Sequence, residues 1–230
     1  MHLYELMAWK RALNELKFKH EEMELIKEYS GSAASAFQTW LEEYAKKNGF
    51  DLQALNRKRE ERLQRQKQNA PQEQKVIEDK QGNFEVGSYE GSVVAQEQEK
   101  PEIENDEKDS DEMHEVFRRL FKQIAIYLHP DKIQNLSQSE QEERIEAFKK
   151  AKMAFDEQKY FYLLELSERF NIRMPKNYKQ QTRWMKNKLK EVNFELNTLK
   201  NTYNYLFAEC ETDADKDKLV RGFIKQVFNV

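Results

Sequence analysis

The pattern of hydrophobic and polar positions predicts a chain built mostly from helices. From residue 2 to about 29, apolar residues recur at alternating steps of three and four, which is the spacing of a coiled coil or a helical hairpin. This N-terminal seam consists of Leu6, Trp9, Leu13, Leu16, His20 and Met23. Gly31 is expected to end this helix, and Ser32 or Ser35 is expected to cap the next one. That helix should stop at Asn48-Gly49, and Asp51 should cap a third, more polar helix. Residues 1–68 are therefore predicted to be an N-terminal helical region.

The helical pattern disappears between residues 69 and 108, where Gln, Glu, Lys, Gly and Ser dominate. Such a composition predicts a disordered linker. Heptad spacing returns near the C-terminus, along a seam made of Met185, Leu189, Val192, Leu196, Leu199, Tyr203 and Leu206. Thr212-Asp213 is expected to break the chain before a short apolar helix. Residues 176–230 are thus predicted to form a C-terminal coiled-coil helical hairpin.

The most informative stretch is VFRRLFKQIAIYLHPDK at residues 116–132. Projected at 100° per residue, it places its apolar side chains on one arc. This apolar arc contains Val116, Phe117, Leu120, Phe121, Ile124, Tyr127 and Leu128. Arg118, Lys122 and His129 lie on the opposite arc, with Arg119 at its margin. The helix should end at Leu128 or His129, because Pro130 lacks an N–H group and disfavours helical geometry in the residue before it. Its start is expected at Asp109, as the N-cap.

A second helix is predicted shortly after the His-Pro-Asp sequence. Ser137 with Glu140 and Ser139 with Glu142 both have the spacing of a capping box. The expected inward stripe of this helix is Ile145, Phe148, Ala151, Lys152 and Phe155. A loop of roughly eight residues makes the two helices pack antiparallel, with Phe121 and Phe148 buried against each other.

These residues together resemble the J-domains of the DnaJ class of co-chaperones. The resemblance rests on HPDK at 129–132, on the basic helix 116–128 that precedes it, and on FKxxxxAF at 148–155. It implies an all-α fold in which residues 109–175 form a J-domain-like antiparallel helical hairpin, flanked by the two coiled-coil regions and the linker. The short first helix of the family has no counterpart just before the hairpin. Either another segment, such as the helical stretch 156–175, takes its place, or the module is a reduced hairpin.

The resemblance also implies a function. In that family, the His-Pro-Asp loop and the basic helix dock on a DnaK-type chaperone of the heat-shock 70 kDa class and stimulate its ATPase. The residues carried over as partner-binding are His129, Pro130, Asp131, Lys132, Arg118, Arg119 and Lys122. Their chemistry agrees with this role. A carboxylate such as Asp131 can accept two hydrogen bonds from a partner arginine, and basic side chains steer a protein toward an acidic surface.

A structural or adaptor role is the alternative hypothesis. The two coiled-coil regions would then hold a partner or a second copy of the chain, and the hairpin would be a degenerate J-like element without chaperone stimulation. The absent first helix favours this alternative, whereas the HPDK sequence and the basic face oppose it. Stimulation of a chaperone ATPase distinguishes the two.

Composition narrows the other possibilities. The net charge of −3 argues against a nucleic-acid partner. The single Cys210 allows no internal disulfide and no cysteine-rich zinc module. No catalytic pair is expected at His129 and Asp131, since the proline between them should point their side chains apart and no nucleophile is placed to use them. No cofactor or metal site is expected either, because the sequence has no glycine-rich phosphate loop and no HExxH motif. No stretch approaches the roughly 20 apolar residues of a membrane helix, so a cytoplasmic protein without a membrane partner is expected.

Overall fold

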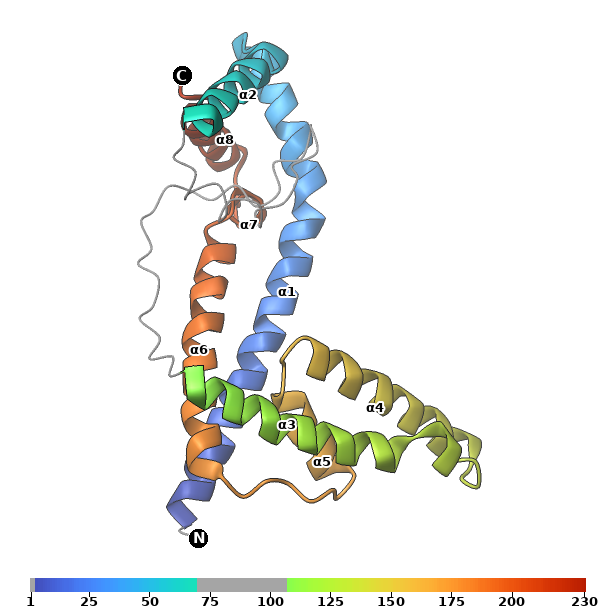
Figure 1. Cartoon of the computed structure of the whole chain (residues 1–230). Coiled ribbons are helices and arrows are strands. Elements are labelled where there is room, and N and C mark those ends of the chain that lie inside the picture. Colours follow the sequence, from blue (N-terminus) through green and yellow to red (C-terminus); the bar gives the residue numbers. More distant parts are fainter. Residues whose placement is uncertain (1–2, 70–106) are drawn as a thin grey trace. The chain divides into compact units, whose positions relative to one another are not determined.

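The computed structural model describes residues 3–69 and 107–230, and this part of the chain is all-α, as the sequence predicts (Figure 1). Its α-helices are α1 (Leu3–Asn48), α2 (Leu52–Asn69), α3 (Glu107–Leu128), α4 (Gln138–Asp156), α5 (Phe161–Arg169), α6 (Tyr178–Lys200), α7 (Tyr203–Ala208) and α8 (Asp213–Phe228). One turn of 3₁₀-helix, η3 (Pro130–Lys132), lies between α3 and α4. The described residues contain no strand. The predicted linker at 69–108 falls outside the described residues, except for its helical ends.

The helices form two compact units that are discontinuous in sequence. Unit 1 takes its described residues from the ranges 1–22 and 100–194, and unit 2 from 23–99 and 195–230. The long helices α1 and α6 therefore each contribute to both units. The predicted N-terminal and C-terminal regions are likewise each divided between the units.

Helix α1 is longer than the sequence predicts, because Gly31 does not end it. Glycine costs roughly 1 kcal/mol relative to alanine inside a helix. The buried positions nevertheless continue through this point at helical spacing, with Ile26, Ser30, Ala33 and Phe37 facing inward. Packing along this face outweighs the local cost of the glycine. The predicted stop at Asn48-Gly49 is confirmed, with Gly49 in the left-handed conformation at φ +74°.

The predicted C-terminal seam is interrupted. Met185, Leu189, Val192 and Leu196 are buried along α6, but the helix ends at Lys200. Thr202 has an extended backbone, and its hydroxyl accepts a hydrogen bond from the Tyr205 N–H group, which starts α7. Thr212 caps α8 in the same way, at the predicted break.

The core of unit 2 is aromatic. Its buried cluster contains Phe37, Leu41, Tyr203, Phe207, Val220, Phe223, Ile224 and Phe228. The Phe37 ring lies edge-on to the rings of Phe207 and Phe223, at centroid distances of 5.5 and 5.2 Å. Edge-to-face pairs of this kind add to the stabilisation from burial. The apolar pattern of α8 is therefore explained by packing within this unit.

Candidate functional site

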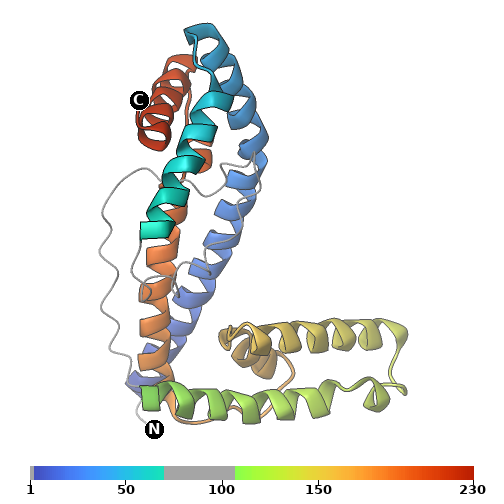
Figure 2. The same cartoon turned by 45° about the horizontal axis from the view of Figure 1, so that its top comes forward.

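The central element of unit 1 is the hairpin of α3 and α4, which lie side by side and run antiparallel (Figures 1 and 2). Helix α3 ends at Leu128, just before Pro130, as predicted. It begins at Glu107, so Asp109 lies inside the helix and the prediction of an N-cap there was wrong. The buried face of α3 is narrower than the predicted arc, because Val116 and Phe121 are only half-buried and Tyr127 is exposed. The fully buried residues are Met113, Phe117, Leu120, Ile124 and Leu128.

Helix α4 starts at the predicted capping box. The Ser137 hydroxyl accepts from the Glu140 N–H group, and the Glu140 carboxylate accepts from the Ser137 N–H group at 3.1 Å. The inward stripe differs from the prediction, because it is centred on Ala147, Ala151 and Ala154. Small side chains at a helix contact allow a short interaxial distance, and the larger residues then lie at the edges of the contact.

The aromatic pairing across the hairpin also differs from the prediction. Phe121 and Phe148 are both half-buried, not fully buried. The Phe121 ring stacks on Phe155, with centroids 4.7 Å apart and planes 10° apart. Phe148 instead lies edge-on to His129, at 6.2 Å. Phe148 thus supports the loop that carries the His-Pro-Asp sequence.

This loop is held in a defined conformation by its own backbone. The Lys132 N–H group donates to the His129 carbonyl at 2.9 Å, and the Ile133 N–H group donates to the Pro130 carbonyl at 3.3 Å. Ile133 is buried and anchors the loop to the hairpin. On the far side, the Gln141 amide donates to the Leu136 carbonyl at 2.8 Å. The loop is therefore a pre-formed turn.

The side chains of His129 and Asp131 lie close together, which corrects the expectation that Pro130 points them apart. His129 Nδ1 accepts a hydrogen bond from the Asp131 N–H group at 3.3 Å and lies 3.5 Å from Asp131 Oδ2. In a neutral ring with Nδ1 as acceptor, Nε2 carries the proton and is a donor. The two side chains are 50% and 79% exposed. The turn thus presents a donor and a carboxylate to solvent.

The predicted basic face of α3 is exposed. Arg118 pairs with Glu115 at 2.8 Å from Nε to Oε2, and Arg119 lies 3.8 Å from the same carboxylate. The hydrogen bond from Arg118 holds the pKa of Glu115 below its usual value. Lys122 and Lys132 have no ion-pair partner in the part of the chain that the structure describes. Two acids, Glu115 and Asp131, therefore stand against four basic side chains on this face and the turn.

Sequence reasoning assigned no binding role to Ile126, although this residue is 52% exposed. It lies one turn after Lys122, on the arc between Lys122 and Arg119. The helical projection of the sequence is enough to identify Ile126, because it places this apolar residue on the basic arc. Ile126 gives this surface an apolar contact beside its charges.

The middle of α3, around Phe117, is enclosed by aromatic residues. Helix α5 contacts both α3 and α4, and Tyr160, just before it, stacks on Phe117 with ring centroids 4.6 Å apart. Trp184 of α6 lies 5.3 Å from Phe117 and 5.6 Å from Tyr160. Burial raises the pKa of the Tyr160 hydroxyl, which also forms a hydrogen bond with His114 Nδ1.

The residues that the structure describes contain no group of His, Cys, Asp and Glu side chains arranged to hold a metal ion. None of their helices is both long and apolar enough to cross a membrane. Comparisons with protein-family models, with curated proteins and with solved structures found no match for this chain.

Proposed function

We propose that this protein is a J-domain-like co-chaperone, which docks on a DnaK-type chaperone and stimulates its ATPase. The observation that carries the proposal is the pre-formed and exposed His-Pro-Asp turn at the end of a basic helix face. The exposed histidine and carboxylate of this hydrogen-bonded turn have no part in the core. Such side chains are available for contact with another molecule.

The chemistry of the turn suits a protein partner. The Asp131 carboxylate can accept two parallel hydrogen bonds from a partner arginine, and His129 Nε2 can donate a further one. Arg118, Lys122 and Lys132 would speed association with an acidic surface. Because the turn is already formed, little conformational entropy is lost on binding.

In this proposal, α5 takes the structural place of the missing first helix of the J-domain family. It contacts both helices of the hairpin and contributes the buried side chains of Phe161, Leu163, Leu164 and Leu166. A hairpin of two helices has little core of its own, so a third helix is needed to fix the direction of the basic face.

The protein would perform no chemistry itself. Stimulation would arise because the turn and the basic face bind the hydrolysis-competent conformation of the chaperone more tightly than its other conformations. A ligand shifts a conformational equilibrium only by such a difference in affinity.

ATP turnover by a DnaK-type chaperone of the same organism, measured with and without this protein, tests the proposal. The wild type should accelerate turnover, whereas His129→Gln and Asp131→Asn should abolish the acceleration and leave helicity unchanged. Asp156→Asn is the matched control, since Asp156 is an exposed aspartate at the end of α4, away from the turn. Lys122→Glu should lower the stimulation more than Lys149→Glu on α4. A wild-type protein without any stimulation would overturn the proposal.

The adaptor alternative is favoured by a separate observation. Large apolar side chains are exposed along α1, at Leu3, Tyr4, Met7, Phe18 and Leu25. Such residues suit the binding of a partner helix or of a second copy. Concentration-dependent oligomerisation, without any effect on chaperone ATPase, would support the adaptor role.

A further inference from the structure

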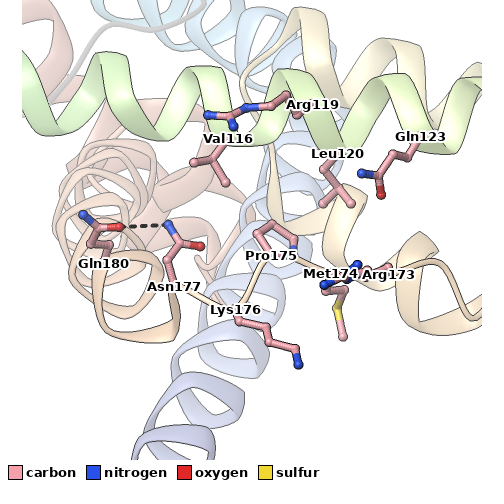
Figure 3. Close-up of a pocket in the computed structure, with 10 residues that line it drawn as sticks. All are labelled: Val116, Arg119, Leu120, Gln123, Arg173, Met174, Pro175, Lys176, Asn177 and Gln180. Carbon is pink, nitrogen blue, oxygen red and sulfur yellow. Dashed lines mark hydrogen bonds between the residues drawn. The ribbon is translucent and has the colours of Figure 1, made fainter. Parts of the chain in front are cut away.

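A groove of about 600 Å³ in unit 1 lies outside the His-Pro-Asp turn. One wall is α3, and the other is the segment that leads into α6, together with the first turn of α6 (Figure 3). Val116 and Leu120 of α3 and Pro175 of the opposite segment provide apolar surface. The groove therefore has apolar side chains on both of its walls.

The charged side chains that line the groove are basic. They are Arg119, Arg173 and Lys176, and none of the described residues that line the groove is acidic. Arg119 also lies 3.8 Å from the carboxylate of Glu115 on the same helix. Arg173 and Lys176 are exposed and have no ion-pair partner among the described residues. Both belong to an unusual part of the sequence, since the range 169–190 contains eight Lys and Arg residues and no Asp or Glu. In a chain of net charge −3, this segregation produces a local positive field.

The wall opposite α3 is fixed by a buried amide. Gln181 is fully buried; its Nε2 atom donates to the Pro175 carbonyl at 3.0 Å and to Asn177 Oδ1 at 2.7 Å. Its Oε1 atom accepts from Trp9 Nε1 at 2.7 Å. Asn177 in turn donates to Gln180 Oε1 at 3.0 Å (Figure 3). Such a network pre-organises the groove, so that little ordering is required when a ligand binds.

We propose that this groove binds an extended, acidic segment of a partner protein whose acidic residues alternate with apolar ones. Carboxylates would pair with Arg119, Arg173 and Lys176, in part through the bidentate geometry that arginine offers. An apolar side chain would lie against Leu120 and Pro175. The amides of Gln123 and Gln180 at the rim could bond the main chain of the segment.

The residues that line the groove favour a peptide over a nucleic acid as the occupant. Sequence-tolerant binding of single strands uses aromatic rings on which bases stack, and none of the described residues that line the groove is aromatic. The aromatic rings of the basic segment are engaged elsewhere in unit 1, with Tyr178 against Trp9 and Trp184 against Phe117. Arg119 belongs both to the groove and to the basic face of α3, but Arg173 and Lys176 belong only to the groove. Replacing Arg173 and Lys176 therefore tests the groove separately from the chaperone function.

Fluorescence anisotropy with the full chain tests the inference. The probe is a short fluorescein-labelled peptide in which Glu and Asp alternate with Leu, and its control has Gln and Asn at the acidic positions. The double variant Arg173→Glu/Lys176→Glu should raise the Kd of the acidic peptide at least about tenfold, or roughly 1.4 kcal/mol. The matched control Lys149→Glu/Lys152→Glu makes the same change in net charge on exposed residues of α4 and should alter the Kd less than about twofold. Circular dichroism of both double variants should match the wild type.

The following results would contradict binding of an acidic peptide in the groove. Equal binding of the acidic and the neutral peptide, or an unchanged Kd for Arg173→Glu/Lys176→Glu, would overturn the proposal. Tighter binding of labelled single-stranded DNA than of the peptide, lost in the same variant, would assign the groove to nucleic acid instead.

His129→Gln should bind the peptide as the wild type does. A failure of chaperone stimulation and a failure of peptide binding can therefore be told apart.

Discussion

The middle of α3 and its C-terminal end bury the same face of the helix but differ in what surrounds it. Around Phe117, in the middle, the rings of Tyr160 and Trp184 enclose the helix, and α5 covers it further. Around Leu128, at the C-terminal end, the buried stripe continues, but its neighbours Ile126 and Tyr127 are exposed and the chain turns into an open loop. The middle of α3 is enclosed within unit 1, whereas its C-terminal end presents polar and apolar groups to solvent.

This difference separates residues that stabilise the fold from residues available for binding. A buried ring contributes through lost contact with water and through close packing, so its replacement costs several kcal/mol. An exposed side chain on a helix contributes little, and most substitutions there change stability by less than about 0.5 kcal/mol. The residue types at the C-terminal end of α3 are therefore not required by the fold.

The largest expected effect is on stability, at the enclosed middle of α3. Phe117→Ala should lower the free energy of unfolding by about 3–5 kcal/mol, because the cavity it leaves is surrounded by fixed aromatic rings. Phe148→Ala should cost clearly less, since Phe148 is half-buried and its ring lies against His129 of the loop. Urea unfolding followed by circular dichroism measures both. Equal losses of stability in the two variants would mean that the middle of α3 and the loop region do not differ in packing.

A smaller effect is expected for Ile126, and on activity rather than stability. Ile126→Ala should change the free energy of unfolding by less than about 0.5 kcal/mol, because this side chain is largely exposed. If the proposed docking is right, it should reduce chaperone stimulation several-fold by removing an apolar contact from the basic face. Met153→Ala is a matched control, since Met153 is an exposed apolar residue of α4. Equal stimulation by the two variants would remove Ile126 from the binding surface.

The smallest expected effect is on the pH dependence of stability, through Tyr160, which packs on Phe117 in the middle of α3. The pKa of Tyr160 is raised by burial, so the neutral hydroxyl is favoured in the folded state. The preference of the folded state for the neutral hydroxyl leaves stability unaffected by pH below about 10, the pKa of an unfolded tyrosine. As the pH rises above that value, the unfolded state loses its proton more readily and the protein becomes less stable. Urea unfolding of wild type and Tyr160→Phe from neutral to alkaline pH should show a steeper loss for the wild type. Parallel curves would show that the hydroxyl does not titrate differently in the two states.

The sequence by itself determined the features that depend on a few neighbouring residues. Pro130 ends α3, the Ser137 and Glu140 pair starts α4, and Gly49 ends α1, because each acts on backbone groups within one helical turn. The turn and basic face were also found this way, since the helical period places Arg118, Lys122 and His129 on one arc.

Only the tertiary structure decided how one helix faces another. A rotation of α4 by about one residue position changes its inward stripe to Ala147, Ala151 and Ala154, and the sequence pattern alone does not distinguish the two stripes. This rotation pairs Phe121 with Phe155 and leaves Phe148 against His129. Packing likewise carries α1 through Gly31 and brings α3 beside the chain around Pro175 to form the groove. The physical reason is that contacts between distant segments depend on the fit of whole surfaces, whereas caps and helix ends depend on local backbone hydrogen bonds.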